Sequence, residues 1–484
     1  MTTQRDSHRW VVLSLAVIAI ACLFTFVIPA QARTINVPGD APTIQEAIDR
    51  SFTGDEIIVA PGTYAENLLI NQKQQLTIQA QNPGQVTIRA IADKPTITVS
   101  NSSQITLQGF VVTGGTAVDL KTLQPVPAGG GIVLSNSQKI VLDQLKLKDS
   151  IGLSLKITSS SATITQIVIP APIAKQAGQE IDGIGISDNS DVTIKGFTVT
   201  SNPGNGIMVQ NSKLSASQGQ IQGNTGVGLQ AKGATLTVAD TTITQQQTGG
   251  VTLDGTQGQL SNVQIISNQG VGLAITGNSS VSADSTTISG HPQGAVLVTD
   301  SSFTLTNGTI TQNAGSGIDA QNSKIDVESS KVFAQPGDGI KLSNSTAQVN
   351  GSQIQNNQGL GVNASGSMLT MNQSEVSGHP GDAVVLGANS QGTIIGSQIH
   401  DNGQRGLFIV QSSSMTMSNT TISKNGAEGV SLASGSIAQI SGSTIEQNAS
   451  YGILNDQSNA TVSASTVAQN AQDGLSVLTN RWSR

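Results

Sequence analysis

Acidic, basic and aromatic side chains are scarce in this sequence, so the segment where they gather is the first candidate for chemistry. Charged residues make up 11% and aromatic residues 2% of the 484 residues. The densest mixture lies at or just beside the start of short apolar segments that repeat along the chain. Its members are Asp319, Asp338, Lys341, Asp382, Arg405, Phe408, Glu428 and Tyr451, with His379 and Asp401 nearby.

Paired carboxylates beside a base could break a glycosidic bond. Asp338 and Asp382 lie two repeats apart, which is ~9.6 Å if the repeats stack as parallel strands. This is near the upper limit for the two carboxylates of inverting glycosidases. We therefore predict a patch whose catalytic residues are Asp338, Asp382, Arg405 and Glu428, and whose substrate-binding residues are Asp319, Lys341, His379, Asp401, Phe408 and Tyr451.

The same residues have a purely structural alternative. Asp382, Arg405 and Glu428 fall in consecutive repeats and could form an ion-pair ladder that needs no substrate. Such exposed pairs contribute ~0–1 kcal/mol each. A second candidate site comprises Glu180, Asp182, Asp188 and Asp191, beside two insertions (residues 113–129 and 170–182) that should emerge at one corner. Long loops of this kind are either functional or surface decoration.

Histidine, methionine and cysteine offer little for a metal. His291 and His379 each follow Ser-Gly and precede Pro, 88 residues apart, at a position otherwise held by Asn or Gln. We interpret them as substitutes for those amides. His400 should point to the surface, and the methionines should fill the core. Cys22 is the only cysteine, so we expect no metal and no cofactor, with Ca²⁺ as the one ion that an acidic substrate could require.

A repeat of 22 or 23 residues must position these side chains. Glycine, or once alanine, opens an apolar-x-apolar triplet at residues Gly206, Gly228, Gly250, Gly272, Gly294, Gly317, Gly339, Gly361, Ala383, Gly406, Gly429, Gly452 and Gly474. A column of Ile and Val runs from Ile221 to Val467, and a polar column three residues later, mostly Asn, runs from Asn224 to Asn470. Stacked amides of this kind can hydrogen-bond from one coil to the next.

Three short strand-like pieces fit each repeat, so the sequence predicts an all-β, right-handed parallel β-helix. A leucine-rich horseshoe would need leucine at most core positions, whereas Ile and Val dominate here. Roughly 17 coils would make a rod about 80 Å long. We expect a signal peptide over 1–32, an N-terminal cap with a short amphipathic helix over 33–70, and the β-helix over 71–484.

The first 32 residues read as an export signal. Arg5 and Arg9 precede an apolar run that ends before Ala30-Gln31-Ala32, a small-x-small cleavage site. The mature protein should therefore be secreted, periplasmic or at the cell surface. We expect contact with a membrane only if this segment stays uncleaved. We expect a monomer.

The cap region carries a resemblance to a known family. Thr43-Ile44-Gln45-Glu46 is a capping box, followed by Gly54-Asp55 and by Pro61-Gly62-Thr63-Tyr64-x-Glu66. This string resembles the entry to the pectin-lyase-like right-handed β-helix proteins, which include pectinesterases, polygalacturonases and alginate epimerases. The resemblance implies a polysaccharide partner and, for an enzyme, a polysaccharide lyase or glycoside hydrolase. The catalytic motifs of these enzymes are not matched.

The distribution of charge limits the kinds of partner that this protein can bind. The formal net charge is −7, and no Lys or Arg occurs between Gly233 and Ser323. Nucleic acid is excluded as a partner because phosphate contacts need clustered Lys and Arg. We expect an exported protein that binds or processes a polysaccharide on the outer face of one sheet, with a non-catalytic structural or adhesive envelope protein as the alternative.

Overall fold

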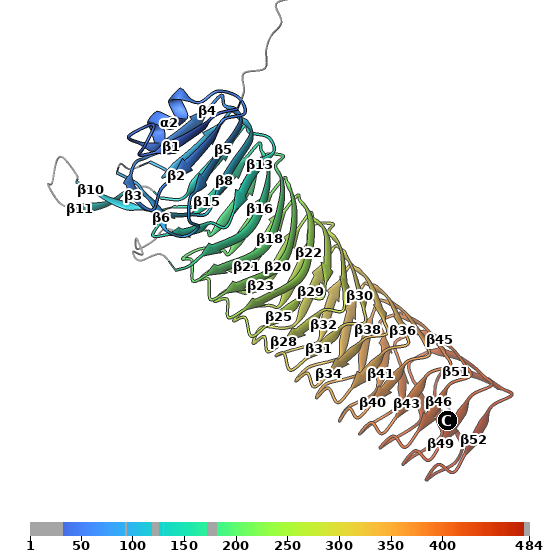
Figure 1. Ribbon diagram of the computed structural model, residues 1–484. Coiled ribbons are helices and arrows are strands. Elements are labelled where there is room, and N and C mark those ends of the chain that lie inside the picture. The colour runs from blue at the N-terminus through green and yellow to red at the C-terminus, as the bar shows by residue number, and fades with distance from the viewer. Residues whose placement is uncertain are drawn as a thin grey trace, which may run out of the picture.

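The chain folds as a right-handed parallel β-helix that forms one elongated rod (Figure 1). The computed structural model describes residues 32–91, 94–118, 125–128, 130–150, 152–171 and 182–478. The expected signal peptide, apart from Ala32, lies outside the described residues. The rod has about 19 turns, more than the roughly 17 predicted, because strands of the cap region also join the stack. β1 (Thr34–Val37) pairs with β2 (Glu56–Val59), which pairs in turn with β5 (Gln74–Ala80).

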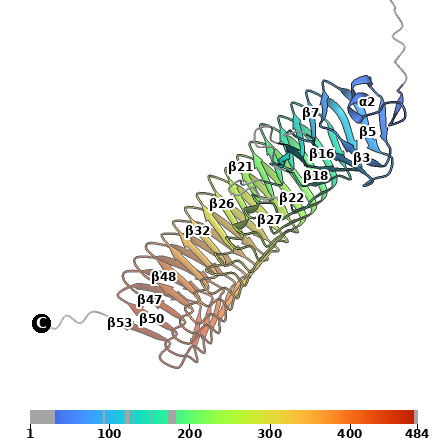
Figure 2. The same cartoon turned by 90° about the vertical axis from the view of Figure 1, so that its left-hand side faces the viewer.

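Each regular coil contributes three short strands, one to each of three faces of the rod. In one coil these are β33 (Lys324–Glu328), β34 (Lys331–Phe333) and β35 (Ile340–Ser343). Each strand pairs in parallel with its counterparts in the coils before and after. Figure 2 shows the coils stacked along the rod. Because the register advances by one whole coil at every step, equivalent side chains form columns along the rod.

Two of these faces carry the candidate sites described below. The anchor face is the sheet that contains β32 (Ile318–Gln321), β35, β38 (Val362–Ser365), β41 (Val384–Gly387), β44 (Leu407–Ile409), β47 (Val430–Leu432) and β50 (Ile453–Asp456). The groove face is the sheet that contains the first half of β22 (Thr235–Thr244), then β24 (Gln257–Ser261), β27 (Ser280–Asp284), β30 (Ser302–Thr306) and β33.

Side chains alternate between the interior and the solvent along most strands. The predicted inward column is confirmed, since Ile221, Ile354 and Ile445, among others, are fully buried. Ile and Val suit these positions because branched side chains pack well on a pleated surface. The narrow interior is thus filled by stacked aliphatic side chains along the rod.

The amide column is also confirmed, and its hydrogen bonds run in one direction. The Asn402 N–H donates to the Asn425 side-chain oxygen at 3.2 Å, and the Asn425 N–H donates to that of Asn448 at 3.0 Å. The Asn425 amide also donates to the Ile399 carbonyl at 3.3 Å. We call this column the asparagine ladder. It satisfies turn N–H groups that would otherwise be buried without partners.

The two buried histidines belong to the asparagine ladder, as predicted. His379 Nδ1 accepts from the Asn357 N–H at 3.2 Å, and its Nε2 lies 3.0 Å from the Ile354 carbonyl. This pairing requires the neutral tautomer that carries its proton on Nε2. His291 makes the same two contacts, with Asn268 and Ile265. Burial lowers the pKa of both imidazoles.

Two further internal ladders are built from hydroxyl groups. In one, the Ser323 N–H donates to the Ser345 hydroxyl at 3.0 Å, and the pattern repeats from coil to coil. In the other, the Ser330 N–H donates to the Ser352 hydroxyl at 3.1 Å. Each hydroxyl in turn donates to a backbone carbonyl near its own corner, as Ser345 does to Ser343 at 2.8 Å. The corners of the coil are therefore fixed by side chains as well as by sheet pairing.

The glycine anchors lie where one coil passes closely over the next. A Cβ on Gly339 would approach Ile354 Cγ2 to 2.5 Å and the Gly361 carbonyl to 2.6 Å. One predicted anchor is wrong: Leu273 pairs with Val296, so the position equivalent to Gly272 is Ala295 and not Gly294. The extra residue is taken up in the preceding turn, where Gly294 has a φ of +119°.

The predicted cap helix is α2 (Ile44–Arg50), which lies at the N-terminal end of the rod (Figure 1). The Thr43 hydroxyl accepts from the Glu46 N–H at 3.1 Å, which is one half of the capping box. Glu66 contributes the remaining contacts, since its carboxylate accepts from the Ile44 and Gln45 N–H groups at 3.0 and 2.9 Å. Ile44, Ala47 and Ile48 are buried, so the helix covers the interior of the first coils.

Of the two insertions, the first forms an antiparallel hairpin of β10 (Gly115–Val118) and β11 (Pro125–Ala128), which projects from the side of the rod (Figure 1). Most of the second insertion lies outside the described residues.

Candidate functional site

The anchor face brings most of the predicted patch together. The strand pairing places Asp319 beside Lys341, and Val385 beside Phe408. Lys341 Nζ lies 3.1 Å from Asp319 Oδ2, and both side chains are partly exposed. The columns read from the sequence are therefore confirmed by the register, but Asp319 and Lys341 already neutralise each other.

The centre of the patch is a compact group of three side chains. The Arg405 guanidinium donates to both oxygens of Asp382, at 2.9 Å from Nε and 2.8 Å from Nη2. The Arg405 N–H donates to Asp382 as well, at 2.9 Å. The guanidinium lies over the Phe408 ring with Cζ 3.5 Å from its centroid. Asp382 is only 7% exposed, so the expectation that it faces solvent is wrong, because Arg405 covers it.

The other two predicted catalytic acids are also engaged. Asp338 accepts from the Leu360 N–H at 2.8 Å and from the Asn363 amide at 3.0 Å. Glu428 accepts from the Ser450 hydroxyl at 2.9 Å. Within the described residues, the proposed ion-pair ladder therefore has one ionic step, between Asp382 and Arg405. All four side chains have partners inside the protein.

Three remaining patch residues separate into different environments. Tyr451 is half-buried at the same corner as Glu428, one coil further on. His379 lies inside the rod at 1% exposure, in the asparagine ladder, and does not reach the outer surface. Asp401 lies at a different corner, where its carboxylate is 2.7 Å from His400 Nδ1. The structure thus does not bring His379 or Asp401 to the anchor face.

His400 itself sits between two carboxylates. It ends β43 (Gln398–His400), and its Nε2 lies 3.4 Å from Glu375 on the neighbouring strand β40 (Glu375–Ser377). Glu375 also accepts from Gln355 at 2.8 Å and from Ser377 at 3.0 Å. This cluster is a closed hydrogen-bonded group on the third face of the rod.

The second candidate site is only partly described. Asp182 accepts from the Asn205 N–H at 2.7 Å, and Asp191 lies 3.6 Å from Lys213. Asp188 accepts from the Ser187 hydroxyl at 3.2 Å, and Glu180 lies outside the described residues.

In the described part of the chain, no three His, Cys, Asp or Glu side chains are grouped so as to hold a metal ion. Among the described helices, none has the length and apolar character needed to cross a membrane.

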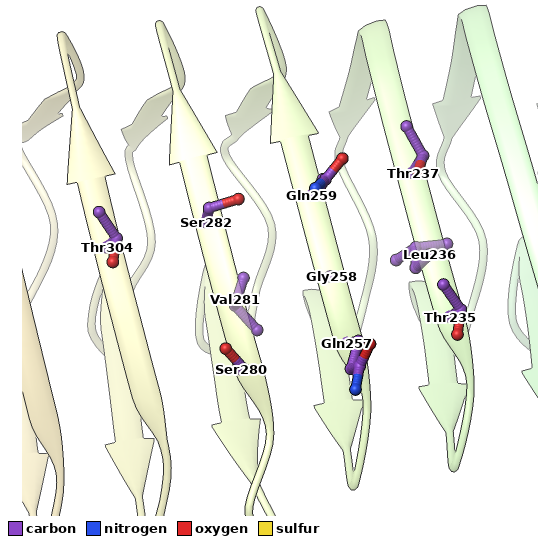
Figure 3. A pocket seen from close by; sticks show the side chains of 10 residues that line it. All are labelled: Thr235, Leu236, Thr237, Gln257, Gly258, Gln259, Ser280, Val281, Ser282 and Thr304. Atoms are coloured by element: carbon purple, nitrogen blue, oxygen red, sulfur yellow. The ribbon is translucent and has the colours of Figure 1, made fainter.

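A hollow of about 460 Å³ lies on the groove face. Its outward lining consists of hydroxyl and amide side chains from consecutive coils (Figure 3). These are Thr235, Thr237, Gln257, Gln259, Ser280, Ser282 and Thr304. The glutamines of β24 lie next to the serines of β27 (Figure 3). The inward residues Leu236, Gly258 and Val281 also line the hollow. A second hollow, of about 470 Å³, adjoins it at the corner near Asp300, Asn322 and Lys324.

The groove differs from the anchor-face patch in how its polar groups are used. Within the described residues, the seven outward side chains of the groove make no hydrogen bond to the protein, and all except Thr304 are exposed. The patch acids and Arg405, by contrast, are committed to internal contacts. Of these two surfaces, the groove is therefore the one whose donors and acceptors are available to a ligand.

Sequence analysis missed this groove. The signal was present as alternating polar residues at the period of the coil, Thr235-x-Thr237, Gln257-x-Gln259 and Ser280-x-Ser282. Nothing in the type of these residues marks chemistry, so the sequence did not single them out.

The stacked coils make this chain a β-helix protein with a long, continuous outer face. Residues 95–258, 182–332, 249–392 and 338–482 match the family described as "Right handed beta helix region". The chain therefore belongs to this family. The resemblance to the pectin-lyase-like β-helix proteins is confirmed for the fold.

Individual proteins match this chain over a shorter segment or at low sequence identity. A segment of 89 residues is 37% identical to a cell surface glycoprotein of Methanothermus fervidus, over 18% of this chain and 14% of that protein. The chain thus spans a small part of this curated relative. Among solved structures, the surface adhesin PfbA of Streptococcus pneumoniae gives a TM-score of 0.33 at 12% identity, covering 89% of this chain and 88% of that one. A periplasmic alginate epimerase gives 0.36 at 11% identity, covering 80% and 83%. The pectin methylesterase of Aspergillus niger gives 0.31 at 15% identity, covering 46% and 81%. None of these likenesses bears on the activity of this chain.

Proposed function

We propose that this protein is an exported polysaccharide-binding rod that holds its ligand on the groove face. The observation that supports this most directly is the row of exposed hydroxyl and amide groups without partners among the described residues, lining the hollow from Thr235 to Thr304. Sugars are recognised through hydroxyl groups that both donate and accept hydrogen bonds. Ser, Thr and Gln side chains offer the same two roles.

The spacing of the groove suits an extended ligand. Consecutive coils are ~4.8 Å apart, which is close to the length of one sugar ring in a polymer. A polysaccharide chain lying along the rod axis would therefore meet an equivalent set of side chains at each coil. Affinity would then grow with the number of coils that the ligand spans.

Binding without bond cleavage agrees best with the anchor-face geometry. Asp338, Asp382 and Glu428 all accept hydrogen bonds from protein groups, and Arg405 is held by Asp382. An acid-base catalyst needs a carboxyl group within reach of the substrate. The catalytic roles predicted for these residues remain a proposal that the experiment below separates from groove binding.

Export rests on the leader sequence and receives support from the cell surface relative. A secreted, periplasmic or surface location would place the rod where polysaccharides of the cell envelope occur. The same similarity favours a second candidate function, a structural or adhesive rod of the envelope that binds no free polysaccharide.

The test is binding of the purified protein to a panel of soluble polysaccharides, with and without Ca²⁺. The groove variant Gln257→Ala/Gln259→Ala should lose most of the binding. Its matched control is Gln220→Ala/Gln222→Ala, which removes two glutamines at the same spacing from a different face of the rod. Retained binding in the groove variant would refute the proposed surface. If Asp338→Ala or Arg405→Ala abolishes binding instead, the anchor face is the site.

A further inference from the structure

The groove lies in the part of the chain that contains no cationic residue. Between Gly233 and Ser323 the charged side chains are five aspartates, Asp240, Asp254, Asp284, Asp300 and Asp319. The flanking lysines are already neutralised: Lys232 Nζ lies 3.5 Å from Asp254, and Lys324 Nζ lies 3.1 Å from Asp326. Asp254 and Asp319 are ion-paired in turn, to Lys232 and Lys341, so Asp240, Asp284 and Asp300 are the carboxylates of this segment without an ion-pair partner among the described residues. The net charge of this segment is therefore negative.

A further carboxylate, outside this segment, lies one coil beyond the groove. Asp326 on β33 pairs in register with Thr304 on β30, so it continues the column of outward side chains by one coil. Its Oδ2 contacts Lys324, whereas its Oδ1 is buried and has no hydrogen-bond partner among the described residues.

We infer that the groove binds an uncharged polysaccharide. This inference rests on the proposed function and specifies its ligand class. A polyuronate or sulfated glycan would bring negative charges to a surface that offers aspartates and no free cation. The repulsion from several like charges, screened by water, together amounts to about tenfold in affinity.

The experiment compares one neutral glucan with the same glucan after carboxymethylation, by isothermal titration at low and at moderate salt. The neutral polymer should bind about tenfold more tightly at low salt, and the difference should shrink as salt screens the aspartates. Asp326→Asn should reduce the discrimination by weakening the repulsion. Gln259→Lys should improve binding of the carboxymethylated polymer, since it places a cation on the groove face.

The outcomes separate the two proposals. Tighter binding of the carboxymethylated glucan by the unaltered protein, with or without Ca²⁺, would overturn the ligand class and leave groove binding in place. Equal affinity for both polymers, insensitive to salt and to Gln259→Lys, would overturn it as well. If neither polymer nor any member of the wider panel binds, the proposed function itself fails.

Discussion

Removing one rung of the asparagine ladder should destabilise the rod strongly. In Asn425→Ala, the Asn402 N–H loses its acceptor and the Ile399 carbonyl loses its donor, while both groups stay buried. Each buried group left unpaired costs about 1–3 kcal/mol. The free energy of unfolding of the affected coils should therefore fall by about 2–6 kcal/mol.

Urea denaturation followed by circular dichroism measures this change, and hydrogen exchange at the Asn402 amide locates it. Ser423→Ala, two residues away on the outward side, should change the stability by less than about 0.5 kcal/mol. Asn425→His should cost much less than Asn425→Ala at neutral pH, because His291 and His379 already serve at equivalent positions. A loss below 1 kcal/mol in Asn425→Ala, by the same scale, would show that the ladder does not hold the coils together.

Three further changes test other parts of the structure. Stability should fall as the pH drops below about 6.5, the ordinary pKa of histidine. Burial lowers the pKa of His291 and His379, so the unfolded chain takes up protons that the folded rod does not bind. A pH series of melting temperatures measures this fall, and the double variant His291→Asn/His379→Asn should make the melting temperature less dependent on pH. Ile310→Asp should unfold several coils by burying a charge, whereas Thr309→Asp, on the outward side beside Lys331, should be tolerated; equal solubility and melting of the two variants would contradict the inward assignment. Asp382→Ala should cost about 1–3 kcal/mol, because it removes the partner of Arg405 at a nearly buried position, while Glu428→Ala should leave the melting temperature almost unchanged; the opposite order would contradict the geometry.

The fold was predictable because a repeat enforces agreement among its copies. One coil with Ile354 and Asn357 at the right spacing would be a weak signal, but many copies at 22 or 23 residues leave few alternatives. The ladder histidines were recognised for the same reason. The register error at Gly294 shows the limit, since adjacent Gly and Ala residues cannot be told apart when a turn gains one residue.

The site was harder to predict because the sequence shows where charged residues lie but not whether they are already paired within the protein. The sequence correctly placed Asp382 and Arg405 in one column, but it could not show that Arg405 folds back onto Phe408 and closes over the carboxylate. Nor could it show that Asp326 keeps one oxygen unpaired. Whether a polar side chain is available depends on partners from neighbouring coils, and those partners appear only in three dimensions.

The uniform stacking has a consequence for how the length of this rod can change. Each coil passes its hydrogen bonds to the next in the same way, through the asparagine and serine ladders, so a whole coil can be added or lost without leaving a rung unpaired. The two Ser-Gly-His-Pro strings, 88 residues apart, are what a duplication of four coils would leave behind. The distance from α2 to the far coils therefore changes in steps of ~4.8 Å, one step for each coil that is gained or lost.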